Sequence, residues 1–219
     1  MNMKKFFSLL MAALMMASVL AGCGGTEEAP AEDTQTPAED TQTPAEGEAT
    51  GTGTELKFST GGDQGTYYGF GSVLAQAITS SGTGTKVTAV TSNGSQDNIE
   101  QMDMNTRQLG FVQSDVMSYA YDGTNLFEGM PITNFSTVAA LYMEQVQIVT
   151  CNPDIKTVAD LKGKTVSIGA AGSGVFYNAL DILGAYGLDY ETDINAQYQD
   201  FGDSADALQD GKIDAAFVV

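Results

Sequence analysis

The sequence predicts an α/β protein in which strands lead through glycine-rich loops into helices. The alternation of apolar and polar side chains over residues 56–60 predicts a strand, and the glycines within 61–65 predict a tight turn. Apolar residues then recur at helical spacing over 70–78. The same order of strand, glycine loop and helix returns at 165–168, 169–174 and the residues that follow.

The loop at 61–65 has the chemistry of an anion site. A helix start exposes unpaired N–H groups and a partial positive charge, and glycine lets a ligand approach the backbone. This stretch therefore indicates a recess for a small anionic or zwitterionic ligand. A plain strand-to-helix turn is the alternative that these residues leave open.

Two further polar loops follow predicted strands. Strands are expected at 86–91 and 109–112, each followed by polar residues and then by a helical pattern. In open parallel sheets, ligands bind beyond the carboxyl ends of the strands, so three such loops favour a shared site. The polar side chains concerned are Ser95, Gln113, Ser114 and Asp115. Ser95, Ser114 and Asp115 could equally serve as helix N-caps.

The second half of the chain predicts a second lobe. Residues 123–135 have the composition of a long loop, and two strand-like runs follow it at 137–142 and 146–150. This order predicts that the chain crosses into another lobe, with lobe 1 at 55–140 and lobe 2 at 141–219. Further elements are expected as short helices at 157–161 and 204–209 and as strands at 165–168, 198–201 and 214–219.

The first 22 residues have the pattern of a lipoprotein signal peptide. Lys4 and Lys5 precede an apolar run over 6–20, and Cys23 follows the small residues at its end. We expect the Cys23 thiol to be lipidated and to anchor the chain outside the cell membrane. An uncleaved membrane anchor or an ordinary signal peptide is the alternative.

Residues 23–54 are predicted to be a disordered acidic tether. The segment after Cys23 contains PAEDTQT twice in tandem, with eight acidic residues, no basic residue and no Val, Ile, Leu, Met or aromatic residue. Such a composition buries too little apolar surface to offset the entropy of ordering. The folded part is expected to begin near Glu55.

Charge and composition exclude several functions for residues 55–219. Seven Lys and Arg residues stand against twenty Asp and Glu residues, a balance that argues against nucleic-acid binding. The chain has no histidine, the commonest general base and metal ligand. No pair of acids has a spacing typical of acid–base catalysis. We therefore expect no enzyme, no cofactor and no metal, and we interpret Cys151 as a buried apolar side chain.

Four stretches together resemble the TAXI family, the extracytoplasmic solute receptors of TRAP transporters. They are TGGDQGTYYGFGSVLAQAI, QLGFVQSDVMSYAYDG, VADLKGKTVSIGAAGSG and ALQDGKIDAAFVV, of which TGG-x-x-GTYY is the most specific. The resemblance runs from about Leu56 to Val219. It implies a periplasmic-binding-protein-like α/β fold, a two-lobed clamshell of type II-like form that closes on a small carboxylate or an amino acid such as glutamate. It also implies delivery of that solute to a TRAP-type membrane permease.

The resemblance and the residues together predict one ligand site between the two glycine loops. Tyr67 and Tyr68 are expected to supply an apolar wall and a hydroxyl, although either could be a core residue. Arg107 is expected on the surface, so carboxylate capture is expected to depend on backbone amides. The predicted ligand-binding residues are Gly62, Gly65, Thr66, Tyr67, Tyr68, Ser95, Gln113, Ser114, Gly172, Ser173 and Gly174.

The resemblance also raises one expectation about the end of the chain. Family members continue past the strand that corresponds to 214–219, so the resemblance predicts a truncated chain with an incomplete second lobe. Two other functions stay open at this point. The same clamshell could signal to a membrane partner as a sensory lipoprotein, or the chain could be an exported enzyme acting on an anionic metabolite.

Overall fold

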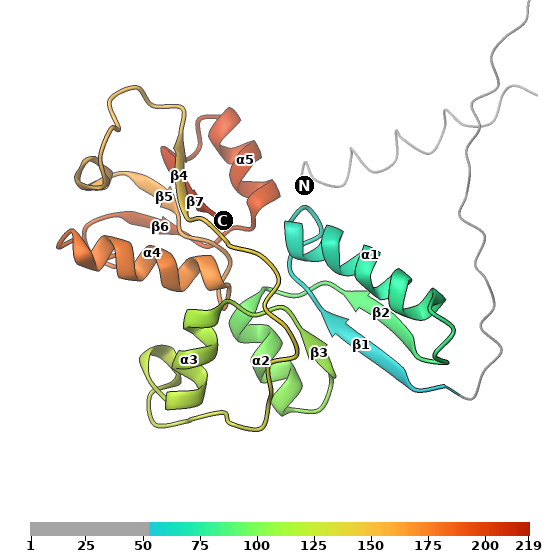
Figure 1. Ribbon diagram of the computed structural model, residues 1–219. Coiled ribbons are helices and arrows are strands. Elements are labelled where there is room, and N and C mark those ends of the chain that lie inside the picture. Colours follow the sequence, from blue (N-terminus) through green and yellow to red (C-terminus); the bar gives the residue numbers. More distant parts are fainter. Residues whose placement is uncertain (1–52) are drawn as a thin grey trace, which may run out of the picture. The chain divides into compact units, whose positions relative to one another are not determined.

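The computed structural model describes residues 53–219, which lie within one compact unit of residues 47–219. Two separate sheets organise this part of the chain (Figure 1). The predicted signal peptide, the lipidation of Cys23 and nearly all of the predicted tether lie outside the described residues. Among the described residues, no helix has the length and apolar character needed to span a membrane.

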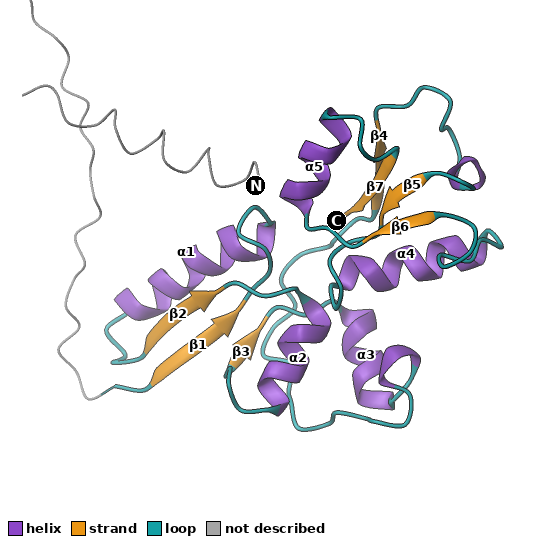
Figure 2. Cartoon of the chain, turned by 180° about the vertical axis from the view of Figure 1, so that it is seen from behind, coloured by secondary structure: helices purple, strands orange, loops and turns teal. Residues whose placement is uncertain are grey.

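The first sheet is fully parallel and has the strand order β2-β1-β3. The carboxyl ends of its strands point toward the second sheet, and each end leads through a loop into a helix (Figure 2). The elements are β1 (Glu55–Ser59), α1 (Thr66–Ser80), β2 (Lys86–Val90), α2 (Ser95–Asp103), β3 (Leu109–Gly110), α3 (Ser114–Asp122) and a 3-10 turn at Asn125–Phe127. The predicted alternation of strands and helices is confirmed here. The observed β3 is shorter than the predicted strand at 109–112.

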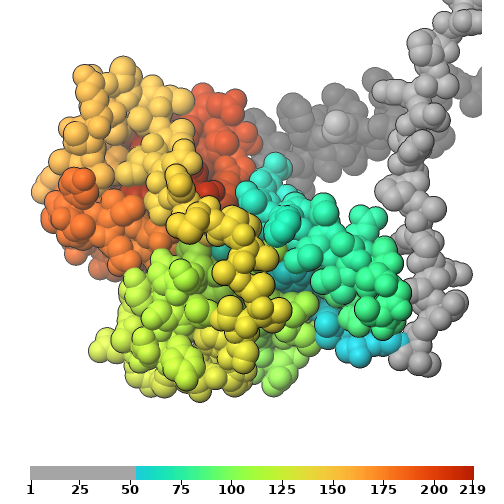
Figure 3. Space-filling view, viewed as in Figure 1, coloured from blue at the N-terminus to red at the C-terminus, as the bar shows by residue number. Residues whose placement is uncertain are grey.

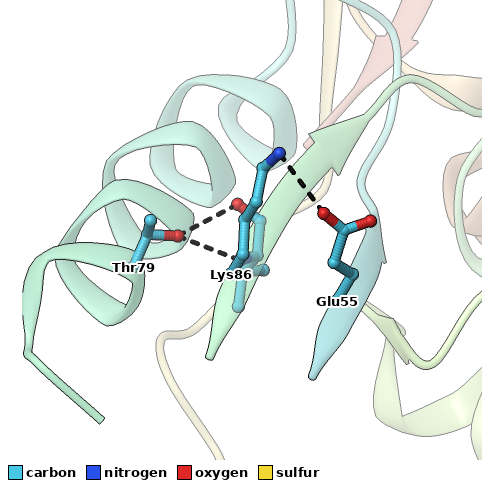
Figure 4. Close-up of polar contacts among 4 residues, drawn as sticks. Glu55, Thr79 and Lys86 are labelled. Atoms are coloured by element: carbon cyan, nitrogen blue, oxygen red, sulfur yellow. Dashed lines mark hydrogen bonds and ion pairs between the residues drawn. The ribbon is translucent and has the colours of Figure 1, made fainter. Parts of the chain in front are cut away.

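Polar contacts fasten the outer end of α1 to β2 (Figure 4). The Thr79 hydroxyl accepts from the Val87 backbone N–H at 2.9 Å and donates to the Val87 carbonyl at 3.3 Å. Lys86 and Glu55 form an exposed ion pair at 3.4 Å across the neighbouring strands. Exposed ion pairs of this kind add little stability, so the two hydrogen bonds of Thr79 contribute more to the attachment of α1 to β2.

The second sheet is mixed and has the order β4-β7-β5-β6. β5 is parallel to both β6 and β7, whereas β4 is antiparallel to β7. The elements are β4 (Gln147–Thr150), a 3-10 turn at Val158–Leu161, β5 (Thr165–Ser167), α4 (Gly174–Ala185), β6 (Asn195–Gln197), α5 (Phe201–Gln209) and β7 (Ala215–Val218). The predicted second unit of strand, glycine loop and helix is confirmed as β5, residues 168–173 and α4.

The predicted strand at 137–142 is wrong. Residues 133–146 contain no helix or strand and run over the surface from the first half to the second (Figure 3). Pairing with another strand begins only after this stretch, where β4 starts at Gln147. An apolar, β-branched run becomes a strand only if another backbone pairs with it, and Val138 remains 87% exposed.

Three smaller predictions are also wrong. The strand expected at 198–201 lies instead at Asn195–Gln197, because that register pairs with β5. Ser95 is the first residue of α2 and not its N-cap, which is Gly94. Cys151 is exposed because it directly follows β4 at the start of a loop, so the interpretation as a core side chain fails.

Three apolar clusters hold the sheets and helices together, and one of them packs α5 near β7. Of the two that involve the first sheet and its helices, the smaller one packs α1 on the sheet through Phe58, Ala75, Val87 and Phe111. The larger one joins α2 and α3 of the first half to α4 and the second sheet. Its fully buried members include Ile99, Val116, Tyr177, Leu183 and Phe217. The predicted boundary between residues 140 and 141 falls in the segment without helix or strand, and the division into two lobes stays a prediction.

Candidate ligand cavity between the two sheets

A cavity of about 750 Å³, which includes its open mouth, lies where the strand-to-helix loops of both sheets converge. Most of the predicted ligand-binding residues line it: Gly62, Gly65, Thr66, Tyr67, Ser95, Gln113, Ser173 and Gly174. The two glycine loops, which are separated by about half of the chain, therefore contribute to a single cavity. This convergence follows from the parallel strands, whose carboxyl ends meet at one edge of each sheet.

On the first sheet, Asn98 holds the strand ends that form the cavity wall. Its buried side-chain amide donates to the Thr60 carbonyl at 2.8 Å and to the Phe111 carbonyl at 2.7 Å. These two carbonyls directly follow β1 and β3, so α2 ties both strand ends together. The Ser92 hydroxyl also donates a hydrogen bond to the Thr60 carbonyl, at 3.0 Å. The wall is thus built by side chains that bind backbone groups.

Tyr67 reaches into the cavity from the first turn of α1 and donates its hydroxyl to Glu144 at 3.2 Å. Burial, and secondarily the negative charge of Glu144, raises the pKa of Tyr67 well above its ordinary value. The phenol is therefore protonated at neutral pH and acts as a donor. Its ring also packs on Phe111, with centroids 5.0 Å apart. Tyr67 therefore supplies the predicted apolar wall and hydroxyl and also contacts the core.

On the second sheet, the loop at 169–173 is tightly folded. Gly169 has a φ of +89°, and a Cβ there would overlap the Val175 side chain. The Ser173 side chain caps α4 by accepting from the Phe176 N–H at 3.1 Å. Ser173 is thus the N-cap of its helix, and its hydroxyl oxygen already has a structural partner.

The two halves touch directly on one side of the cavity, at the starts of α2, α3 and α4. The Gln96 backbone N–H donates to the Gly172 carbonyl at 2.9 Å, and the Tyr177 hydroxyl donates to the Gln96 side chain at 3.0 Å. A Cβ on Gly174 would overlap the Gln113 amide, so α4 approaches the β3–α3 loop closely because residue 174 is glycine.

The halves also meet on the other side, at the starts of α1 and α5. A Cβ on Gly62 would lie 3.5 Å from Asp200 Oδ2, and one on Gly65 would lie 3.6 Å from the Phe201 ring. Asp200 is the N-cap of α5 and accepts from the Asp203 N–H at 2.8 Å. The cavity is therefore bounded by helix starts on both sides.

Three predicted residues do not line the cavity. Tyr68 follows Tyr67 along α1 and so points about 100° further round the helix. Ser114 is exposed in the first turn of α3, and Gly172 uses its carbonyl for the contact with Gln96. Arg107 lies outside the lining, as expected, and donates to the neighbouring Thr106 carbonyl at 3.0 Å.

Sequence reasoning missed several polar lining residues: Gln64, Ser92 and Asn93 in or next to the predicted loops, and Glu144, Gln199 and Asp200 away from them. Of the last three, Gln199 and Asp200 follow the carboxyl end of β6, and the strand-end rule would have identified them if the strand had been placed at 195–197. Glu144 carries no such signal, because it lies in a segment without regular structure. Among residues 53–219, no group of three or more Asp, Glu or Cys side chains could hold a metal ion.

Comparison with solved structures places this architecture among periplasmic binding proteins. The alkanesulfonate-binding protein SsuA from Xanthomonas axonopodis pv. citri, bound to MOPS, matches with a TM-score of 0.50 and 20% identity over 75% of this chain and 54% of that chain. The chain thus spans about half the length of that protein. The mixed α/β fold of periplasmic binding proteins, predicted from the sequence, is confirmed.

Two weaker matches bind other solutes. The GluR0 ligand-binding core from Nostoc punctiforme in complex with L-glutamate has a TM-score of 0.47 and 19% identity over 74% of this chain and 68% of that chain. A marine metagenome TRAP solute-binding protein with 3-hydroxybenzoate has a TM-score of 0.46 and 14% identity over 76% and 57%. Residues 58–219 match the NMT1-like family, and the chain belongs to it.

Proposed function

We propose that this chain is an extracytoplasmic solute receptor that captures a small carboxylate or amino acid between its two halves. The observation that carries the proposal is the single cavity lined by glycine loops from both sheets. Backbone N–H groups at helix starts bind carboxylates without a basic side chain. The match to a periplasmic binding protein supports the same function at the level of the fold.

The transporter type is the more specific part of this proposal. The TGG-x-x-GTYY motif resembles the TAXI receptors, so we propose that the chain delivers its solute to a TRAP-type permease. Lipidation of Cys23 would keep the receptor at the membrane beside that permease. Ligand binding would favour the closed arrangement of the halves, the form that a permease recognises. The protein acts as a binding protein and not as an enzyme in this scheme.

A thermal-shift screen tests the proposed function. The purified chain is heated with single amino acids, dicarboxylates and monocarboxylates, and binding of one class raises its melting temperature by mass action. The variant Ser173→Asp places a negative charge in the cavity wall and should abolish the shift. A matched variant outside the cavity, Thr157→Asp, should retain it. The absence of a shift with every compound contradicts the proposal.

A further inference from the structure

The charged side chains that line the cavity are all acidic. Glu144 and Asp200 belong to the lining, and no Lys or Arg does. Asp200 Oδ1 caps α5, whereas Oδ2 is directed toward the glycine loop of α1 and has no donor within residues 53–219. A ligand with two carboxylates would therefore meet like charge with no cationic side chain to offset it.

The orientation of the Gln113 amide adds an acceptor to the same wall. Asn178 Nδ2 donates to Asp115 at 2.8 Å, and because a carboxylate only accepts, this contact fixes the orientation of the Asn178 amide. Asn178 Oδ1 then accepts from Gln113 Nε2 at 3.1 Å. The Gln113 oxygen is left buried without a donor among the described residues, as is the amide oxygen of Gln199.

Buried acceptors without donors are costly, because each loses its hydrogen bonds to water. Gln113 and Gln199 both line the cavity, together with Glu144 and Asp200. These four side chains thus bring carboxylate and amide acceptors to the lining. A ligand that brings N–H donors complements them.

The starts of the helices show where an anionic group would bind. Asp97, Asp115 and Asp203 lie in the first turns of α2, α3 and α5 and offset the positive ends of those helices. The start of α4 is capped by Ser173. The start of α1 has neither an acid in its first turn nor a side-chain cap, because its N-cap is Gly65. Among these helix starts, the N–H groups of α1 therefore have the fewest competing groups from their own helix, with the Asp200 carboxylate of α5 lying beside the loop.

From this division of charge we infer that, if the chain is a solute receptor, its cavity selects a zwitterion with one carboxylate and one protonated amine. The carboxylate binds the N–H groups at the start of α1. The amine donates to the carboxylates and amide oxygens of Glu144, Asp200, Gln113 and Gln199. The rest of the ligand is uncharged, and dicarboxylates without an amine are excluded.

Four probes that differ by one group at a time test this inference by isothermal titration calorimetry on the purified chain. Glutamine carries one carboxylate and the amine, and glutaramate is glutamine without the amine. Glutamate and glutarate are the corresponding pair with a second carboxylate. We expect removal of the amine to weaken binding by roughly tenfold or more, the typical effect of losing a charged hydrogen bond. We also expect glutamine to bind more tightly than glutamate.

The double variant Glu144→Gln/Asp200→Asn tests the residues themselves. Both changes keep the shape and one acceptor oxygen, so the contacts to Tyr67 and Asp203 can persist. The preference for the amine should shrink severalfold, and glutarate should bind better than it does to the unchanged chain. Glu128→Gln/Asp154→Asn removes the same charge from exposed sites outside the lining and should leave both affinities unchanged.

The outcomes separate the inference from the proposed function. If an amine-free carboxylate binds best, in this set or in the wider thermal-shift screen, the receptor function stands and the requirement for an amine is overturned. An amino acid outside the four probes that binds best, with its amine-free analogue weaker, supports the inference. If no compound binds at all, both the receptor function and the inference fail.

Discussion

The two glycine loops look alike in the sequence but differ physically in the fold. The loop before α1 has Gly65 as N-cap, with no side-chain cap, and its glycines lie outside the left-handed region of φ. In the loop before α4, Gly169 and Gly172 have φ values of +89° and +81°, and Ser173 caps the helix. The first loop leaves its helix start open for a ligand, whereas the second is fixed by its own backbone and side chains.

This comparison predicts unequal effects of alanine in the two loops. Gly169→Ala forces a side chain into the left-handed region and against Val175, so it should lower the free energy of unfolding by about 2–4 kcal/mol. Gly62→Ala meets only ordinary contacts with Asp200 and should cost less than about 0.5 kcal/mol. Urea unfolding followed by circular dichroism measures both. Equal losses would remove the distinction between the loops.

The open loop should depend on Asn98 for its support. Asn98→Ala removes two buried hydrogen bonds and leaves the Thr60 and Phe111 carbonyls without that donor, which should cost about 2–3 kcal/mol of stability. Asn195→Ala is a control at an exposed asparagine of β6. Urea unfolding again gives the difference. A cost below about 0.5 kcal/mol for Asn98→Ala would show that the strand ends keep their positions without the hydrogen bonds of Asn98.

The capped loop should lose a smaller amount when its cap is removed. Ser173→Ala deletes the acceptor of the Phe176 N–H, and the loss of such an N-cap typically costs about 1 kcal/mol. Thr66→Ala changes a hydroxyl residue at the start of α1, where the side chain makes no cap, and should change stability by less than about 0.5 kcal/mol. The melting temperatures of both variants are measured in the absence of ligand and compared with that of the unchanged chain. A larger loss for Thr66→Ala would reverse the assignment of open and capped helix starts.

Sequence patterns predicted most of the elements, and most of the ligand-binding residues that they predicted line the cavity, because both depend on local features. Alternation at 56–60 and helical spacing at 70–78 reflect which side chains face a core, and polar residues after strands follow from parallel topology. The expectation that ligand-binding residues follow strand ends failed where the strand itself was misplaced. Because 198–201 was expected to be a strand, Gln199 and Asp200 were not recognised as residues that follow a strand end.

The elements that sequence reasoning got wrong depend on partners distant in the chain. Residues 137–142 have the composition of a strand but lie without a pairing backbone among the described residues, and Cys151 is apolar but sits at an exposed turn. Pairing and burial are set by what the rest of the chain brings alongside, which composition does not encode.

The sequence alone determined the α/β class, the two glycine loops and an acidic folded region without histidine. Only the tertiary structure decided that both loops meet at one cavity, that one is open and the other capped, and that Glu144 and Asp200 face the same space. The physical reason is that local patterns fix which face of an element is apolar. The sign of the charge at a site depends on side chains brought together from loops far apart in the chain.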